Sequence, residues 1–142
     1  MHTAAQLLQS KGYDIWSISP DALIIDAIQE MAAKEAGALV VMENEKLVGI
    51  ISERDYARKV ALDGRSSRES LVRDIMSTHV LCARPEQTVQ ECMAMMSEKR
   101  ARHLPVVDHK KVIGVISIGD LVKHIIAEQQ FEIEQLLYYV SS

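Results

Sequence analysis

The segment Gly49-Ile50-Ile51-Ser52-Glu53-Arg54-Asp55 returns 65 residues later as Gly114-Val115-Ile116-Ser117-Ile118-Gly119-Asp120. At this offset residues 15–59 align with residues 80–124 without a gap, and eleven of the 45 aligned positions are identical. Chance alone would give about one identity in fifteen positions at ordinary composition. The chain therefore contains two copies of one unit, and that unit decides the fold.

Each copy shows the same succession of patterns. An extended stretch ends at Pro20 or Pro85, and apolar residues then recur at the i, i+3, i+4, i+7 spacing of a helix that buries one face. In each copy, two short runs of residues that favour β-strands flank a polar turn. This pattern predicts one hairpin at 39–51 and another at 104–116. A second helix is predicted to begin near Asp55 in copy one and near Asp120 in copy two.

We expect an α/β (α+β) fold made of two β-α-β-β-α repeats. One repeat of about 50 residues buries too little apolar surface to be stable alone. Two repeats related by a pseudo-twofold axis and packed sheet to sheet would bury those faces and leave a cleft between the copies. The predicted parts are an N-terminal arm (1–14), repeat one (15–62), a linker (63–79), repeat two (80–127) and a C-terminal helix (128–142).

The helix signals differ between the copies. Thr88 and Glu91 form the sequence of a capping box in repeat two, whereas Leu23 stands at the Thr88 position in repeat one and predicts a weaker helix start. An apolar stripe continues along the C-terminal helix through Ile133, Leu136, Leu137 and Val140. Such a stripe packs either on the pair's own core or on a second chain, and the sequence favours neither arrangement.

The composition is that of a globular protein without a membrane span. Of the 142 residues, 48% are hydrophobic and 25% are charged, and no run approaches the ~20 apolar residues that cross a bilayer. The N-terminus has neither the basic start nor the apolar run of a signal peptide, and two cysteines, Cys82 and Cys92, predict no disulfide framework. We therefore expect a cytoplasmic protein.

The charge distribution bears on the class of partner. The net charge of −4 argues against nucleic acid as a partner. Eleven of the 16 Lys and Arg residues nevertheless lie in the segments 54–73 and 99–111. These segments can hold a local anion, although solvated surface charge is the favoured explanation for any single residue in them.

Motifs of enzymes and metal sites are missing from the sequence. The residues His103, His109, Cys82 and Cys92 do not have the spacing of metal ligands, and there is no Gly-x-x-x-x-Gly-Lys loop. No Ser/His/Asp or Cys/His set can be joined by spacing. We expect no catalytic residues, no metal site, no catalytic cofactor and no enzymatic activity.

The repeated Ser-x-x-Asp has two interpretations. As a capping box, the serine accepts a helix N–H and the acid reaches back, which explains both residues in both copies. As a ligand site, the helix N-terminus suits a phosphate and the aspartate can accept bonds from two neighbouring ribose hydroxyls. The junction also lies where strands end, beside the expected cleft between the copies, and ligands commonly bind at such places.

The chain resembles a tandem pair of cystathionine-β-synthase (CBS) domains, also called a Bateman module. The resemblance covers residues 15–126. It rests on the two Gly-x-x-Ser-x-x-Asp segments, on Arg-His-Leu-Pro-Val-Val at 102–107 and on Val-x-Asp-Ile-Met at 72–76. Similarity around the segment 52–60 is typical of the small bacterial proteins that consist of this pair alone.

The resemblance implies a disc-like pair, often a homodimer, that binds AMP, ADP, ATP, NAD or S-adenosylmethionine. It implies that the motif aspartate binds ribose hydroxyls, that the serine lies near phosphate and that the other repeat holds the base. One implied site joins Ser117 and Asp120 with Ser17, Ala22, Gly37 and Ala38. The other joins Ser52 and Asp55 with Cys82, Gln87, Arg102 and His103, of which the last two match phosphate-contacting positions.

The two copies differ beside the motif aspartates, so the two sites are expected to differ in affinity or ligand. Further predicted binding residues are Ile50, Glu53, Arg54, Arg58, Lys59, Leu104, Pro105, Ile116, Ile118 and Gly119. The resemblance implies a regulatory module that binds an adenine nucleotide, AMP foremost, and signals to an unidentified partner protein through changes in packing. A dimerisation or interaction scaffold that needs no ligand is the alternative.

Overall fold

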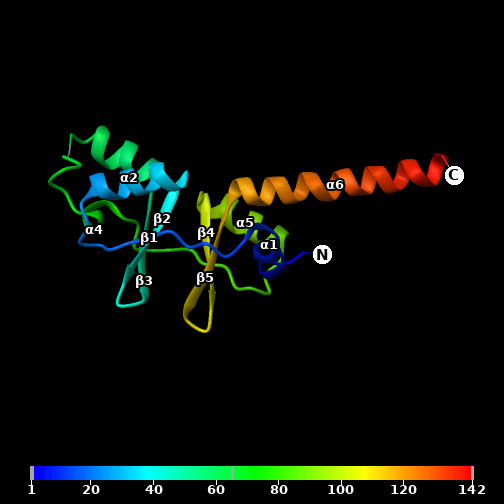
Figure 1. Ribbon diagram of the computed structural model, residues 1–142, viewed down its shortest axis with the longest axis horizontal. Coiled ribbons are helices and arrows are strands. Elements are labelled where there is room, and N and C mark those ends of the chain that lie inside the picture. Colours follow the sequence, from blue (N-terminus) through cyan, green and yellow to red (C-terminus); the bar gives the residue numbers. More distant parts are fainter. Residues whose placement is uncertain (1, 65, 142) are drawn as a thin grey trace.

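The computed structural model describes residues 2–64 and 66–141, so that Arg65 of the basic segment 54–73 and the two chain ends lie outside it. Repeat one contains β1 (Ser17–Ile18), α2 (Ile24–Lys34), β2 (Ala38–Glu43), β3 (Lys46–Ser52), α3 (Glu53–Tyr56) and the π-helix η1 (Ala57–Ala61). Repeat two contains α5 (Val89–Lys99), β4 (His103–Asp108), β5 (Lys111–Ser117) and α6 (Ile118–Ser141). Outside them lie α1 (Ala4–Lys11) and α4 (Val72–Ile75) (Figure 1).

The predicted hairpins form, and they share one register. In β2–β3, Gly49 pairs with Val41, and in β4–β5, Gly114 pairs with Val106. Each antiparallel ladder shifts directly after that pair. The hairpins lie side by side with their turns at the same end, and β3 contacts β5 (Figure 1). The mixed α/β fold predicted from the repeat is thereby confirmed.

The first strand of the unit differs between the copies. In repeat one, β1 pairs in parallel with β2, and the N–H of Val40 donates to the carbonyl of Trp16 over 3.1 Å. Repeat two has Pro105 at the Val40 position, and proline has no N–H to donate. The corresponding pairing is reduced to a single parallel bridge between Ala83 and Val106, so the second sheet has two strands.

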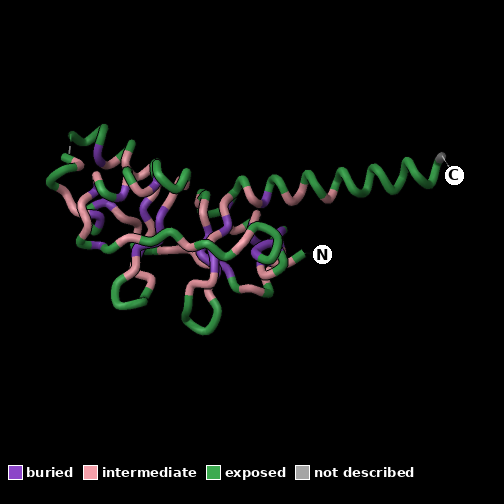
Figure 2. The backbone as a smooth tube through the Cα atoms, in the orientation of Figure 1, coloured by how far each residue is buried: buried purple, intermediate pink, exposed green. Residues whose placement is uncertain are grey.

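Each repeat completes its core with a segment from outside the repeat. The core of repeat two includes Ala4, Leu7 and Leu8 from α1, and the core of repeat one includes Val72 and Ile75 from α4. Figure 2 shows buried backbone within the body of the two repeats, whereas the hairpin turns are exposed. The arm and the linker helix therefore occupy matching places on the two copies.

The capping expectations hold. Thr88 and Glu91 form the reciprocal bonds of a capping box at the start of α5, and Leu23 gives α2 no side-chain cap. The last helix, α6, is continuous from Ile118 and its second half projects away from the two repeats (Figures 1 and 2). Within the described residues, none of the helices has both the length and the apolar character needed to cross a bilayer.

Candidate functional site

Each repeated Ser-x-x-Asp lies at a junction between a strand and a helix. In repeat one, the backbone N–H of Ser52 donates to Asp55 Oδ2 over 2.9 Å, and the N–H of Asp55 donates to Ser52 Oγ over 3.2 Å. In repeat two, the equivalent bonds of Ser117 and Asp120 measure 2.8 and 3.1 Å. Both motifs therefore cap a helix, as the first interpretation requires.

The cap leaves part of Asp120 available. Lys11, the last residue of α1, donates from Nζ to Asp120 Oδ2 over 2.6 Å and to the carbonyl of Val115 over 2.6 Å. Both the cap and Lys11 use Oδ2, so Oδ1 is free of these bonds among the described residues. Burial opposes ionisation of Asp120, but the hydrogen bonds from Lys11 and the N–H of Ser117 outweigh it and lower the pKa of the carboxyl. Asp120 is therefore an anionic acceptor at neutral pH.

A cavity of about 330 Å³ lies next to this aspartate, and we call it the Asp120 cavity. It joins both repeats, because Ser117 and Asp120 of repeat two face Gly37 and Ala38 of repeat one. Its remaining walls include Lys11, Asp14, Trp16, Lys34, Glu35 and His103. The volume is within the range of pockets that hold small ligands.

A second cavity of about 860 Å³ adjoins Asp55, and we call it the Asp55 cavity. Ser52 and Asp55 of repeat one face the segment 99–103 of repeat two. Among the described residues, the acidic ones in its lining are Glu53 and Asp55, and six are basic: Arg54, Arg58, Lys59, Lys99, Arg100 and Arg102. This concentration of positive charge favours a phosphorylated anion.

The predicted ligand residues fall into three groups. The Asp120 cavity contains Gly37, Ala38, Ile50, His103, Ser117 and Asp120. The Asp55 cavity contains Gly37, Ile50, Ser52, Glu53, Arg54, Asp55, Arg58, Lys59, Arg102 and His103. Among the described residues, the linings of both cavities leave out Ser17, Ala22, Cys82, Gln87, Leu104, Pro105, Ile116, Ile118 and Gly119.

Some of the residues outside the cavities have structural roles. Leu104 and Ile116 are fully buried in the core of repeat two. Gln87 accepts the N–H of Arg84 through its side chain over 2.8 Å, and its carbonyl accepts the N–H of Ala4 over 2.7 Å. Burial raises the pKa of the Cys82 thiol. Contact of these residues with a ligand stays a prediction.

The sequence interpretation missed the contribution of the N-terminal arm. Lys11, Asp14 and Trp16 line the Asp120 cavity, and the Lys34 ammonium lies 4.7 Å from the centroid of the Trp16 ring. Lys11 and Asp120 are 109 residues apart, so no spacing in the chain indicates their contact. The one available signal was the presence of the basic residue Lys11 in the predicted N-terminal arm.

His103 lies between the two cavities and lines both. A Cβ atom on Gly37 would come 3.3 Å from His103 Nε2, so the ring packs directly against the backbone of repeat one. Burial lowers the pKa of His103, and the opposing attraction of Asp120 does not cancel this effect. A neutral imidazole therefore separates the two cavities at physiological pH.

The pKa of His103 predicts a pH dependence of stability. Between the lowered folded-state pKa and the ordinary value of about 6.5, the unfolded chain binds more protons, so stability falls as pH decreases through this interval. The His103→Gln variant should lose less unfolding free energy than the wild type between pH 7.5 and 5.5. Urea unfolding at a series of pH values measures this, and equal pH slopes for both proteins would contradict it.

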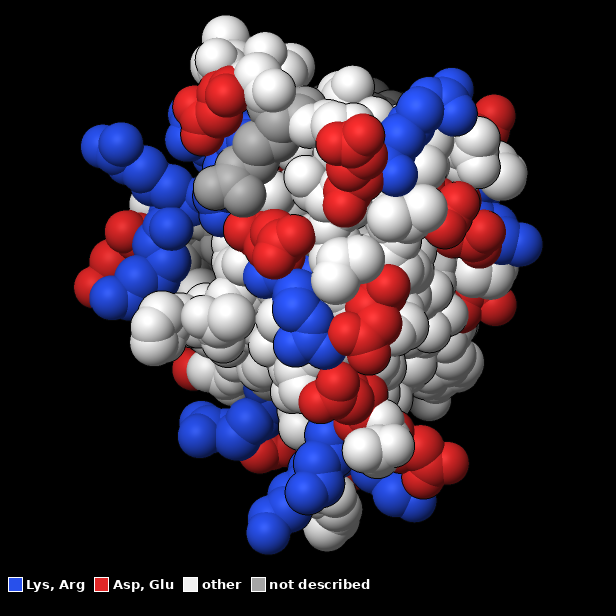
Figure 3. Space-filling model, turned by 90° about the vertical axis from the view of Figure 1, so that its left-hand side faces the viewer, with Lys and Arg blue, Asp and Glu red and all other residues white. Residues whose placement is uncertain are grey.

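Basic and acidic side chains are interspersed on the face shown in Figure 3. Among the described residues on this face, basic side chains do not form the continuous surface that nucleic-acid binding requires. The described basic residues of the Asp55 cavity are instead arranged around a cavity between the repeats.

The chain is similar to known proteins of one family. The model of the CBS domain family matches residues 6–62 and 72–127. The chain is 37% identical to the mitochondrial CBS domain-containing protein CBSX3 of Arabidopsis thaliana, over 97% of this chain and 71% of that protein. A CBS-domain protein from Burkholderia ambifaria is 48% identical, with a TM-score of 0.86 over 89% of this chain and 96% of that one.

A solved structure with the same fold contains adenosine ligands. The CBS domain pair of protein MJ0100 was solved in complex with 5′-methylthioadenosine and S-adenosyl-L-methionine. It has a TM-score of 0.80 over 90% of this chain and 98% of that chain, with 21% sequence identity. At this identity the similarity concerns the fold alone.

Proposed function

The chain belongs to the CBS-domain family and holds two copies of the domain, and we propose on this basis that it is a non-catalytic regulatory module that binds adenine nucleotides. The ligand we expect first is AMP, with ADP, ATP and NAD as further candidates. The observation that carries the proposal is the doubled junction: in each repeat an aspartate at a helix start lines a cavity walled by both repeats. We expect the module to act in the cytoplasm, where free thiols such as Cys82 persist.

The contacts available to a nucleotide follow from the two linings. Asp120 offers Oδ1 to the ribose hydroxyls, and Gly37 and Ala38 border the space for the base without side-chain bulk. In the Asp55 cavity, we expect Arg102 and Arg58, which line it, to bind phosphate oxygens. The six basic residues there suit a nucleotide with more than one phosphate, whereas the smaller Asp120 cavity suits AMP. The adenosine ligands of MJ0100 agree with a purine nucleoside as the common element.

A ligand in either cavity would change how the two repeats pack against each other, and the change would depend on the charge of the ligand. Each cavity has walls from both copies, and both share Gly37, Ile50 and His103. A ligand therefore stabilises one relative placement of the copies, and a partner protein that binds that placement preferentially is regulated. We expect Lys11 to give up its hydrogen bond to Asp120 in part and to turn toward the nucleotide phosphate. This rearrangement would move α1.

A titration tests the proposed function. Purified protein is titrated with AMP, ADP, ATP, NAD and S-adenosylmethionine by isothermal calorimetry, with the melting temperature recorded in parallel. We expect saturable binding of at least one adenine nucleotide and a raised melting temperature, since a ligand that binds only the folded state stabilises it. Absence of heat and of a thermal shift with every ligand would favour the ligand-independent scaffold.

We also propose that the chain forms a homodimer through α6. Apolar side chains recur at helical spacing along its projecting half, where Ile133 is 52% and Leu136 is 67% exposed. A continuous apolar stripe on a helix that leaves the body of the protein fits the same helix of a second copy, as in a coiled coil (Figure 1).

The dimer proposal predicts the behaviour of a double variant. Ile133→Ser with Leu136→Ser should convert a dimer into a monomer in sedimentation velocity at micromolar concentration, because each change removes apolar area from the shared surface. The control is Gln130→Ser, a change at an exposed polar position of the same helix. A wild type that sediments as a monomer, or a double variant that stays dimeric, would contradict the proposal.

A further inference from the structure

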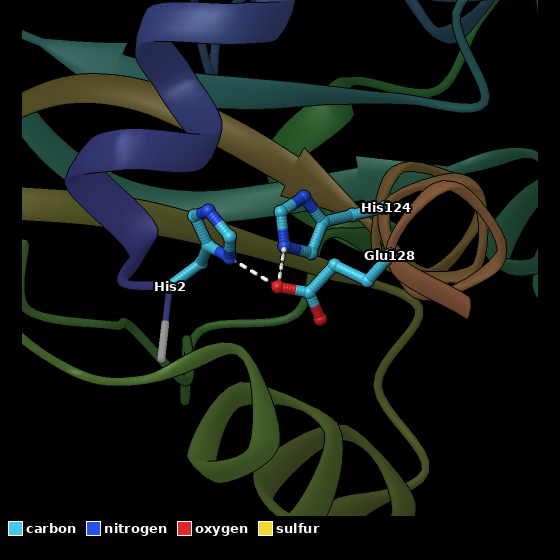
Figure 4. A group of neighbouring side chains, drawn as sticks. All are labelled: His2, His124 and Glu128. Atoms are coloured by element: carbon cyan, nitrogen blue, oxygen red, sulfur yellow. Dashed lines mark hydrogen bonds and ion pairs between the residues drawn. The ribbon is translucent and has the colours of Figure 1, made fainter. Parts of the chain in front are cut away.

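Three potential metal ligands meet outside the linings of both cavities, at the contact between the N-terminal arm and α6. His2 precedes α1, and His124 and Glu128 lie one turn apart on α6 (Figure 4). Their ligand atoms all lie within 4.8 Å of one another. His2 Nδ1 contacts Glu128 Oε1, and His124 Nε2 lies 3.3 Å from the same oxygen. Both imidazoles therefore direct a nitrogen to one carboxylate oxygen.

The backbone holds this cluster in place. The carbonyl of His2 accepts the N–H of Val89 over 2.9 Å, and the N–H of the nearby Ala4 donates to the carbonyl of Gln87 over 2.7 Å. Thr3 forms a bridge with Thr88 and caps α1 with its side chain. On the other side, His124 and Glu128 have the i, i+4 spacing that places two side chains on one helix face. The ligand atoms are thus presented by two backbone segments that are already fixed.

The geometry leaves one buried polar atom unsatisfied. His124 Nε2 has no hydrogen-bond partner within the described part of the chain, although its side chain is only 15% exposed. Its approach to Glu128 has the distance but not the angles of a hydrogen bond. Buried polar atoms without partners are uncommon, and each calls for a physical explanation such as an ion.

We propose that His2, His124 and Glu128 bind one Zn²⁺ ion. Two imidazole nitrogens and a carboxylate oxygen are common zinc ligands, and ligand atoms about 2.0–2.1 Å from a tetrahedral ion lie about 3.4 Å apart. The 3.3 Å between His124 Nε2 and Glu128 Oε1 matches this spacing. Water completes the fourth position, because His2 and Glu128 are partly open to solvent.

A zinc ion at this site would crosslink the first residues of the chain to the first half of α6. The arm also holds Lys11 against Asp120. The three ligands line neither the Asp120 cavity nor the Asp55 cavity. The zinc ligands are therefore separate from the residues of the proposed nucleotide sites, and either proposal can fail while the other stands.

The experiment uses the full chain without a histidine tag. Zn²⁺ is titrated in competition with a chromogenic chelator, and the melting temperature is recorded with and without the ion. We expect one Zn²⁺ per chain and a zinc-dependent rise in melting temperature. Glu128→Gln and His124→Ala should each weaken binding by at least about tenfold, since even outer-shell partners of zinc ligands contribute about 10–100-fold.

Two further variants keep the test decisive. His2→Ala changes a residue outside the helices and should lose zinc binding even if His124→Ala folds poorly. The matched control is His109→Ala, which removes another imidazole paired with a carboxylate, since His109 Nδ1 lies 3.0 Å from Asp108 Oδ1. The control should bind zinc as the wild type does. Absence of stoichiometric binding by the wild type, or equal binding by His2→Ala and the wild type, would overturn the proposal.

Discussion

Asp120→Ala is expected to abolish nucleotide binding at the Asp120 cavity and to leave binding at the Asp55 cavity intact, with Asp55→Ala giving the reverse result. An ionised aspartate that accepts two ribose hydroxyls makes two charge-assisted hydrogen bonds of about 1.5–3 kcal/mol each. Their loss should weaken binding by at least about a hundredfold. Calorimetric titration of each variant, with stoichiometry per chain, measures the effect.

A matched variant separates ligand binding from helix capping. Glu91 completes the capping box of α5 by accepting the N–H of Thr88 over 3.3 Å, and it lines neither cavity. Glu91→Ala should therefore lose about 1 kcal/mol of stability, as each aspartate variant does through its own cap, and should bind nucleotide normally. If the aspartate variants also bind normally while losing only stability, the Ser-x-x-Asp segments are caps and the scaffold alternative gains support.

The features that the sequence could predict are local or repeated. The spacing of apolar residues gives α2 and α5, the polar turns give the hairpins, and the fixed offset of 65 residues relates the two copies. The capping difference between Leu23 and Thr88 could also be predicted, because a cap depends on residues within one turn. Apart from the repeat offset, each of these features is decided within a few residues of the chain.

The features that could not be predicted depend on docking between distant segments. The contact of Lys11 with Asp120 and the meeting of His2 with Glu128 exist because the arm packs on repeat two, and no periodicity in the chain encodes that choice. Pro105 shows an intermediate case. The absence of its N–H follows from the sequence, whereas the reduction of the Ala83 pairing to a single bridge is seen only in the structure.

Gly49, the first residue of the repeated motif, packs against the linker. Its substitution by alanine is the second change for which we expect a large effect. A Cβ atom on Gly49 would lie 2.7 Å from Met76 Sδ and 2.9 Å from the carbonyl oxygen of Ser77. Ser77 cannot easily retreat, because it exchanges two backbone hydrogen bonds of 2.9 and 3.0 Å with Ile50. Gly49→Ala should therefore destabilise the fold by about 1–3 kcal/mol, the cost of forcing an extra methyl group into a packed site.

Gly114 and Gly119 lie in the second copy of the motif, and their alanine variants can be compared with Gly49→Ala by the loss of stability. At Gly114 the nearest atoms belong to the side-chain end of Leu8, at 2.6 and 2.8 Å, and this flexible end can turn aside at lower cost than a backbone carbonyl. At Gly119 the nearest atom is Ser117 Oγ at 3.6 Å, an ordinary contact, so Gly119→Ala should stabilise α6 by about 0.5–1 kcal/mol. Urea unfolding should rank the losses as Gly49 above Gly114 above Gly119. A Gly49→Ala variant as stable as the wild type would mean that residues 76–77 are not held against β3, and the linker would then not complete repeat one as α1 completes repeat two.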